Sequence, residues 1–403
     1  MSDRQLPKWS ELKPLLRPKP VELNAKKRRL AAALTIADLR EVARRRTPRS
    51  VFDYTDGAAE SELSLQRARA TFRDLTFQPS VLQDVGDIDT TTTVLGKPSA
   101  QPFGFGPTGF TRMMHHEGER AVVRVAERVG IPYGLSTLGT TDVEGVAAAS
   151  PGARKWFQLY VWRDHGPAED LMARAKAAGF EALILTVDVP VAGVRLRDVR
   201  NGFNIPPALS ARTVLDGAMH PSWWVNFLTT EPLRFASLDR WDGTVAEMMN
   251  ALFDPTMTLK DLDWVRTTWD GPLIVKGIQT VDDARRMFDA GADAIVLSNH
   301  GGRQLDKAPV PVRLVPDVRD ALGDGPEVMV DTGVMSGSDV VAAMALGASS
   351  VLVGRAYLYG LMAGGEAGVE RAAQILSTEV RRTMALLGAR RIADLGPQHV
   401  RLP

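Results

Sequence analysis

The chain has 403 residues, of which 44% are hydrophobic, so it can bury one large core or the cores of two domains. Its 49 lysines and arginines balance 48 acidic residues, and the net charge of +1 provides no long-range field to attract nucleic acid. Cysteine is absent, which excludes disulfides, thiolate zinc sites and cysteine-ligated iron–sulfur clusters in this chain. With no signal-like apolar core in residues 1–30, these features predict a cytoplasmic protein.

Residues 1–100 precede the first predicted strand of the main fold. Helical patterns at 35–46 and 60–70 indicate an N-terminal helical extension, which we expect to pack on the flank or the bottom of the following domain.

From about residue 101, short apolar runs alternate with longer helical patterns. The predicted strands cover residues 102–106, 131–136, 156–160, 182–187, 273–276, 294–298, 328–331 and 350–354. Helical patterns at 117–129, 169–178, 281–290 and 337–346 each end before a glycine. Eight strands with intervening helices predict an α/β fold, a (β/α)8 TIM barrel over 101–387, followed by a C-terminal tail at 388–403.

Nearly every predicted strand is followed by a polar residue that can take part in chemistry. These residues are Thr108, Ser136, Gln158, Tyr160, Asp188, Lys276, His300, Asp331 and Arg355. One such residue is commonly a cap, but their number favours a barrel over an open sheet, because the carboxyl ends of barrel strands meet at one mouth.

The connection after the fourth strand, residues 189–258, is far longer than an ordinary strand-to-helix loop. We expect a functional insertion, either a lid or a mobile loop. Its aromatic run includes Trp223, Trp224 and Phe227 without a cluster of basic residues. Packing against the barrel or a neighbouring subunit is therefore favoured over membrane docking, which stays open.

The run from Ser298 to Asp306 restricts the possible reactions of the protein more than any other part of the sequence does. His300 can accept a proton near neutral pH, and Arg303 can bind a carboxylate through two parallel hydrogen bonds. Asp188 ends a strand at the same predicted mouth and can orient His300, although capping a turn is its plain alternative. This combination indicates proton abstraction from a small anionic acid.

Lys276 closes a buried apolar strand, so it needs an anionic partner, which a flavin that becomes anionic on reduction would supply. Gly333 and Gly354 follow the seventh and eighth strands, where barrels commonly bind phosphate. The chain has neither a G-x-G-x-x-G dinucleotide motif nor a P-loop. The six histidines form no metal pattern, and the pair His115–His116 predicts a capping and surface feature, so we predict no metal site.

These motifs resemble the FMN-dependent L-2-hydroxy-acid dehydrogenases and oxidases over about residues 35–387. The run 298–306 matches the family signature. The runs 52–57, 107–112 and 331–337 are most similar to the quinone-linked L-lactate dehydrogenases of actinobacteria.

Position by position, the resemblance implies FMN as the cofactor and assigns roles to individual residues. Tyr54 and Arg303 would bind the substrate carboxylate, with Arg195 as a second arginine nearby, and Tyr160 would hydrogen-bond the substrate oxygen. His300 would be the catalytic base, Asp188 its partner and Lys276 the cation beside the reduced flavin. The positions matching FMN contacts are Pro107, Thr108, Gly109, Ser136, Gln158, Thr186, Lys276, Ser298, Asp331, Gly333, Gly354 and Arg355.

Three departures from the family pattern bear on function. Met335 stands where many members have a basic residue near the FMN phosphate, so phosphate binding is expected to depend more on Arg355 and backbone amides. Leu138 replaces the tryptophan of glycolate oxidases, and Gly109 replaces an alanine that several oxidases have beside the flavin.

The resemblance implies oxidation of L-lactate, or a close L-2-hydroxy acid, to the 2-oxo acid, with electrons passed to a quinone-type acceptor. An oxygen-dependent lactate oxidase or lactate 2-monooxygenase is the alternative on the same scaffold. A phosphate-ligand-binding barrel without redox activity is the alternative from another class. We expect a homo-oligomer, a tetramer by resemblance, that binds no nucleic acid and is open to peripheral contact with the inner face of the cell membrane.

Overall fold

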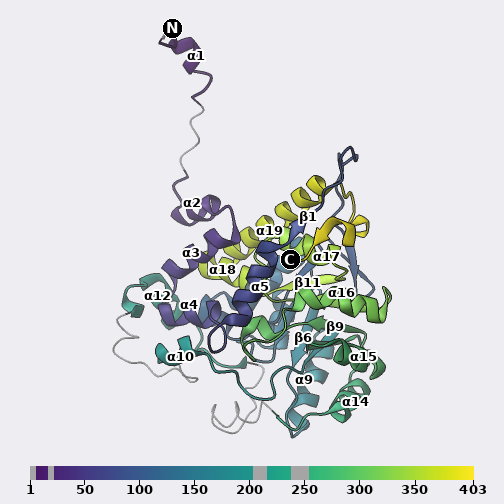
Figure 1. The fold of residues 1–403 in the computed structure, drawn as a ribbon. Helices are drawn as coiled ribbons and strands as arrows, with labels where there is room; N and C mark the ends of the chain where they lie inside the picture. Colours follow the sequence, from purple (N-terminus) through teal and green to yellow (C-terminus); the bar gives the residue numbers. More distant parts are fainter. Residues whose placement is uncertain (1–5, 17–21, 203–215, 237–253) are drawn as a thin grey trace.

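The computed structural model describes residues 6–16, 22–202, 216–236 and 254–403 (Figure 1). Parallel strands close into one barrel in the order β10–β11–β4–β5–β6–β7–β8–β9. The strands are β4 (Phe103–Phe105), β5 (Tyr133–Ser136), β6 (Lys155–Leu159), β7 (Ala182–Thr186), β8 (Leu273–Ile278), β9 (Ala294–Leu297), β10 (Glu327–Val330) and β11 (Ser350–Val353). The predicted TIM barrel is confirmed, and each predicted strand end lies within two residues of the observed one.

Helices follow the strands along the chain and cover the outside of the barrel (Figure 1). They are α6 (Thr111–Met114), α7 (Gly118–Val129), α8 (Val143–Ala149), α9 (Gly166–Ala177), α10 (Leu196–Arg200), α12 (Pro221–Thr229), α14 (Leu259–Thr268), α15 (Val281–Asp289), α16 (Pro311–Leu322), α17 (Gly337–Ala345), α18 (Arg355–Gly364) and α19 (Glu366–Leu387). A short 3-10 helix, η2 (His300–Gly302), follows β9.

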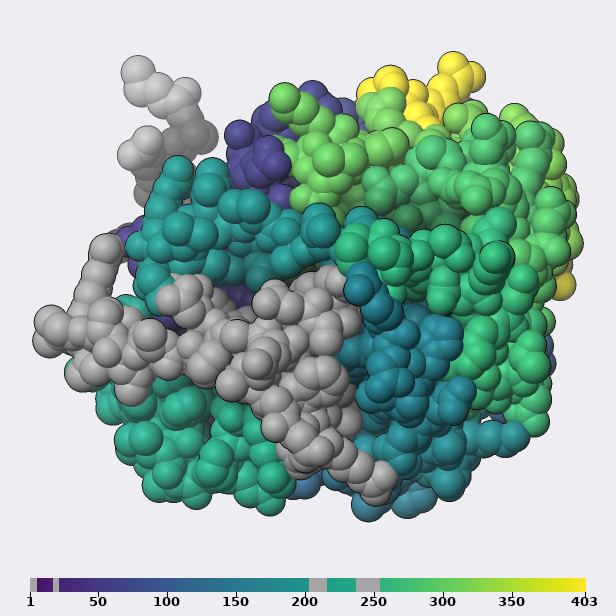
Figure 2. Space-filling view, turned by 90° about the horizontal axis from the view of Figure 1, so that it is seen from below, coloured from purple at the N-terminus to yellow at the C-terminus, as the bar shows by residue number. Residues whose placement is uncertain are grey.

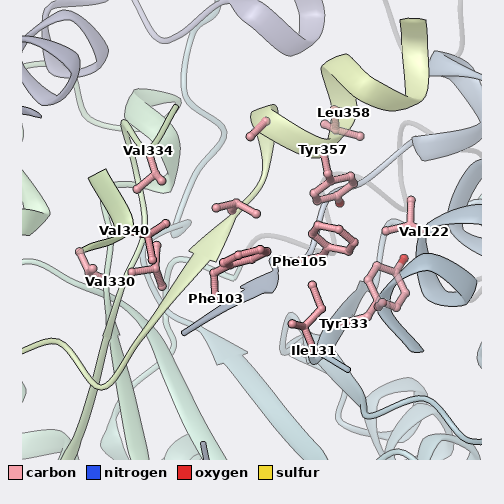
Figure 3. Close-up of a cluster of buried hydrophobic side chains, with 14 of the residues drawn as sticks. Phe103, Phe105, Val122, Ile131, Tyr133, Val330, Val334, Val340, Tyr357 and Leu358 are labelled. Carbon is pink, nitrogen blue, oxygen red and sulfur yellow. The ribbon is translucent and has the colours of Figure 1, made fainter. Parts of the chain in front are cut away.

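The barrel strands are buried on both faces, as expected for a parallel sheet covered by helices. Side chains inside the barrel form a small cluster that includes Trp156, Ile184 and Met329. The outward faces pack against the helices in a larger cluster. Figure 3 shows part of it, where the ring centroids of Phe105 and Tyr357 lie 4.9 Å apart and so join β4 to α18.

The N-terminal segment contributes α1 (Trp9–Leu12), α2 (Ala25–Ala32), α3 (Ile36–Arg46), α4 (Arg49–Asp56) and α5 (Leu63–Asp74). Helix α3 begins at a capping box formed by Thr35 and Asp38, and it packs along α18 (Figure 1). The helix predicted at 60–70 is shifted to 63–74, and α4 was not predicted.

A hairpin of β2 (Thr92–Val94) and β3 (Lys97–Ser99) closes the amino-terminal end of the barrel. The amide of Leu95 donates to the carboxylate of Glu327, at the start of β10, over 2.7 Å. The buried side chain of Val94 belongs to the cluster inside the barrel. The hairpin therefore acts as the floor that we expected the N-terminal extension to provide, whereas α4 and α5 lie near the opposite end.

Residues 388–403, expected as a tail, contain η3 (Ile392–Asp394), η4 (Pro397–His399) and β12 (Val400–Arg401). Strand β12 pairs antiparallel with β1 (Thr76–Phe77), next to α5. The end of the chain is thus attached to the N-terminal segment by backbone hydrogen bonds.

The long connection at 189–258 is described in part, and its residues 203–215 and 237–253 lie outside the described residues. Its helix α10 is tied to α4 by an ion pair of 2.9 Å between Arg197 and Asp56. In Figure 2, teal residues of this connection lie beside purple residues of the N-terminal segment. In α12, the Trp223 indole donates to the carbonyl of Met113 over 2.9 Å, so this part packs on the barrel as predicted. Among the described helices, none is long and apolar enough to cross a membrane.

Candidate active site

A cavity of about 210 Å³ opens at the carboxyl ends of the barrel strands. The strand-end side chains expected at one mouth meet there, including Thr108, Ser136, Lys276 and Asp331. Of all the predicted site residues, Asp188 and Ser298 alone do not line the cavity, and each instead contacts a residue that does. The predicted cluster therefore forms one site.

His300 lies in the turn η2, directly after β9. Its backbone has a positive φ of +59°, which is rare for a residue other than glycine. Its amide donates to the Ser298 hydroxyl over 3.0 Å. Its Nδ1 lies 3.0 Å from Oδ1 of Asp188, so Nε2 is the ring nitrogen left to exchange a proton with a ligand.

Asp188 is almost fully buried, and its side chain is 1% exposed. Burial raises the pKa of Asp188, but the charge and hydrogen bond of His300 and the charge of Lys276 outweigh it, so the net shift is downward. The carboxylate is therefore charged at neutral pH and can stabilise a protonated His300. Gly277 makes this packing possible: its φ is +110°, and a Cβ there would lie 2.6 Å from the Cβ of Asp188.

Two arginines, two tyrosines and His300 form one end of the cavity, which we call the substrate end (Tyr54, Tyr160, Arg195, His300 and Arg303). The Arg303 guanidinium donates to the carbonyl of Tyr54 over 2.5 Å and stacks 4.8 Å from the centre of the Tyr54 ring. Arg195 stacks on the same ring at 5.6 Å. Helix α4, which carries Tyr54, thus brings the N-terminal segment into the site.

The two arginines of the substrate end differ in whether a carboxylate neutralises their charge. Arg195 pairs with Asp198 over 2.7 Å, whereas Arg303 has no ion pair with a carboxylate among the described residues. Burial, followed by the charge of Arg195, lowers the pKa of Arg303. An anion bound at Arg303 would relieve this repulsion. Burial and the charge of Asp188 raise the pKa of Tyr160, so its hydroxyl keeps its proton.

Lys276 lines the cavity, with its ammonium 2.8 Å from the Ser298 hydroxyl and 2.9 Å from the Asp331 carboxylate. Burial lowers the pKa of Lys276, but the charges of Asp331 and Asp188 raise it more, so the side chain is charged. We expected a flavin to be the anionic partner of Lys276. In the structure, the Asp331 carboxylate is a further anionic partner.

Buried polar atoms with no partner indicate what the cavity can hold. Nε2 of Gln158 and Oγ1 of Thr186 are buried without a hydrogen-bond partner in the described structure, and both residues line the cavity. Buried polar groups are normally hydrogen-bonded. A planar ring system with carbonyl oxygens and ring nitrogens, such as the isoalloxazine of FMN, would satisfy them, so these residues fit the cofactor.

Helix α18 begins at a second part of the cavity wall, which we call the phosphate end (Arg69, Gly333, Met335, Gly354 and Arg355). Arg355 donates hydrogen bonds of 2.8, 2.8 and 2.6 Å to the carbonyls of Thr55, Gly301 and Gly57. The residue predicted to bind phosphate therefore also ties α4 to the turn of His300.

Sequence reasoning missed several residues of the cavity wall, namely Leu65, Arg69, Phe110, Met114 and Gln304. Little space is left beside Gly109, because a Cβ there would lie 3.0 Å from the Cβ of Leu138. Phe110 packs edge-on against Phe235 of the long connection, with 4.4 Å between ring centres. Phe110 and Gln304 lie within the runs 107–112 and 298–306 but were given no role there. Leu65, Arg69 and Met114 belong to no motif, and only their place in the fold identifies them.

His115, His116 and Glu117, expected as a surface feature, are partly buried and lie outside the cavity wall. Their possible ligand atoms lie within 4.8 Å of one another. The Glu117 carboxylate, however, accepts a hydrogen bond of 2.5 Å from the amide of Glu366, at the start of α19. Burial lowers the pKa of His115 to about 4, which keeps it neutral at pH 7.

Comparison with known proteins identifies the class of this barrel. Residues 43–402 match the FMN-dependent dehydrogenase family model, so the chain belongs to that family, and FMN is its cofactor. A Mycobacterium tuberculosis protein named "Putative L-lactate dehydrogenase" is 59% identical over 99% of this chain and 96% of its own length. An L-lactate dehydrogenase of Caulobacter vibrioides is 43% identical over 89% of this chain and 95% of its own length.

Solved structures agree with the fold and the family. The monotopic membrane protein (S)-mandelate dehydrogenase has a TM-score of 0.89 and 36% identity, over 92% of this chain and 100% of that one. A variant of mandelate oxidase with (S)-mandelic acid has a TM-score of 0.80 and 38% identity, over 92% and 99% of the two chains.

Proposed function

We propose that this protein oxidises L-lactate, or a close L-2-hydroxy acid, to the 2-oxo acid with bound FMN. The observation that carries the proposal is the His300–Asp188 pair beside Arg303, a cation without a carboxylate partner among the described residues. The names of the relatives, L-lactate dehydrogenases at 59% and 43% identity, support lactate as the substrate.

In this proposal, Arg303 and Tyr54 hold the substrate carboxylate, and Arg195 adds a second positive charge. The Tyr160 hydroxyl donates a hydrogen bond to the substrate oxygen. His300 then takes one proton at Nε2, and the buried charge of Asp188 stabilises the imidazolium that results. FMN, when bound, would accept the electron pair together with the second hydrogen that the substrate loses. Lys276 keeps a positive charge beside that acceptor, in a place where negative charge develops.

The cavity wall favours a small substrate side chain. Leu138 and Phe110 line the cavity, and Phe110 is held from behind by Phe235. A methyl group makes apolar contact with such a wall without displacing it, whereas a phenyl group needs more room. We therefore expect lactate to be preferred over mandelate, the compound after which the solved relatives are named.

We further propose that the electrons pass to a quinone and that the protein touches the membrane surface in order to reach it. In and next to α12, Met219, Val225 and Leu228 have exposed fractions of 79, 59 and 70%, which gives an apolar surface within the long connection. The name of the mandelate dehydrogenase as a monotopic membrane protein supports the same proposal. A tetramer remains our expectation for the assembly.

An anaerobic absorbance spectrum of the purified protein tests the substrate. L-lactate should bleach the flavin bands, with (S)-mandelate and glycolate acting more slowly at the same concentration. A flavin spectrum that mandelate bleaches faster would move the substrate to an aryl hydroxy acid. A spectrum that none of the three acids changes would contradict the proposed reaction.

Mixing the reduced protein with either a soluble quinone or air then tests the acceptor. Rapid reoxidation by the quinone and slow reoxidation by air are expected. The reverse order would instead support the oxygen-dependent alternative.

A further inference from the structure

Two guanidinium groups line the phosphate end of the cavity. Arg69, in the middle of α5, and Arg355, at the start of α18, both line the cavity. Among the described residues, neither forms an ion pair within 4.0 Å. Burial and the charges of Arg303 and Arg69 lower the pKa of Arg355 to about 10, against the charges of Tyr359 and Asp56, so Arg355 is charged at neutral pH.

Arg69 has hydrogen-bonding capacity that its surroundings leave unused. Its Nε is buried and has no hydrogen-bond partner in the described structure. Its Nη2 donates to the Tyr359 hydroxyl over 3.3 Å, which is long for such a bond. A guanidinium has five donors, and a buried donor without a partner is costly. The geometry therefore leaves room for a ligand that accepts hydrogen bonds from Arg69.

The acidic group nearest to this network is already neutralised by other residues. The Asp56 carboxylate lies 2.6 Å from Arg40 and 2.9 Å from Arg197, and it accepts a hydrogen bond of 2.7 Å from Tyr359. Burial raises the pKa of Asp56, but the hydrogen bonds of Arg40 and Tyr359 and the charges of Arg40 and Arg69 lower it more. Asp56 thus has its ion pairs with other residues, whereas Arg69 acts on it by charge alone and, among the described residues, forms no ion pair with it within 4.0 Å.

The surroundings of Arg69 suit a phosphate group. Helix α5 packs against the turn after β10, where a Cβ at Gly333 would lie 3.0 Å from the Cβ of Ala68. The first amides of α18 have no acceptor within the helix and, together with the helix dipole, favour an anion. Met335 adds no charge, and its own amide already donates to Asp339 over 2.7 Å.

We propose that Arg69 binds the phosphate of FMN and supplies, from the N-terminal segment, the positive charge that is missing at Met335. The two unpaired guanidiniums match the two negative charges of a phosphate monoester, and planar guanidinium groups bind phosphate through paired hydrogen bonds. The inference rests on FMN as the cofactor and is independent of the substrate.

The test compares the binding of FMN with that of riboflavin, which has the same ring system but no phosphate. The dissociation constants are measured by quenching of flavin fluorescence on the full-length protein freed of flavin. Arg69→Met should raise the Kd of FMN about tenfold to a hundredfold, as expected for the loss of a charge-assisted hydrogen bond, and should change the Kd of riboflavin less than about threefold.

Two further variants guard against misfolding and a nonspecific charge effect. Arg67→Met removes an exposed arginine from the same helix and should leave both constants unchanged. The double variant Arg69→Met with Met335→Arg returns a cation to the phosphate end and should recover most of the preference for FMN over riboflavin.

Equal weakening of FMN and riboflavin in Arg69→Met would show a structural role and overturn the proposal, as would unchanged binding of FMN. If Arg69→Met does not fold, the preference of Arg69→Lys for FMN over riboflavin is measured instead. A smaller preference than that of the wild type supports the contact, and an unchanged preference contradicts it. A wild-type protein that binds neither flavin would instead overturn the cofactor.

Discussion

The two ends of the cavity are both positively charged, yet they are built in different ways. At the substrate end, the charge of Arg303 lies beside His300 and its buried partner Asp188, within reach of a group that can be protonated and deprotonated. At the phosphate end, Arg69 and Arg355 come from two helices, next to glycine-rich turns. The first end can bind and react, whereas the second can only bind. Substitutions at one end should therefore change rates, and those at the other end should change the affinity for the cofactor.

Replacing the base His300 should show most clearly that the substrate end controls the rate and not the affinity for FMN. His300→Gln should slow anaerobic flavin reduction by L-lactate about a thousandfold or more, because the proton acceptor is lost, and should leave the Kd of FMN unchanged. Stopped-flow absorbance measures the rate. His165→Gln is a matched control, since His165 also faces a carboxylate, Asp261, at 3.3 Å but lies outside the cavity wall. Reduction that persists near the wild-type rate would reject His300 as the base.

The two arginines of the substrate end should differ from each other. Arg303→Lys should lower the ratio of the reduction rate to the lactate Kd about a hundredfold, because lysine cannot form two parallel hydrogen bonds with a carboxylate. Arg195→Lys should have a smaller effect, because Asp198 already neutralises much of the charge of Arg195. Single-turnover kinetics at several lactate concentrations give both values. Equal losses would show that the two arginines share the carboxylate.

Lys276 belongs to neither end, and its replacement should change both the rate of reduction and the affinity for FMN. Lys276→Met leaves the Asp331 carboxylate without its ion pair, next to the place where the flavin ring fits. We expect both a slower reduction and a weaker binding of FMN, each by about tenfold. Fluorescence quenching and stopped-flow reduction on the same preparation measure the two effects. A change confined to the affinity for FMN would remove the proposed role of Lys276 in the reaction.

Much of the barrel and its mouth could be predicted from the sequence, because the information is local there. A strand such as β9 is an uninterrupted apolar run, and the polar residue that follows it must lie at the carboxyl edge. Tyr54 and Arg195 were named through resemblance alone, since neither follows a barrel strand. Helix α4 was missed because its eight residues lack a capping side chain.

Arg69 marks the limit of such prediction. In the sequence it is one arginine among three in a surface-like amphipathic helix, α5. What distinguishes it is a buried Nε without a partner, which depends on the packing of α5 against residues more than 250 positions later in the chain. Long-range contacts of this kind leave no periodic pattern in the sequence.

The hydrogen bonds of Arg355 have a consequence for how the protein is made. The guanidinium joins Thr55 and Gly301, and the first of these bonds spans 300 residues of the chain. During synthesis, α4 leaves the ribosome long before the residue that will hold it in place, so it must wait for most of the barrel to follow. The site cannot be completed before Arg355 has been made, and a nascent chain that stops before β11 contains the base and the substrate arginine without the clamp that joins their turn to α4.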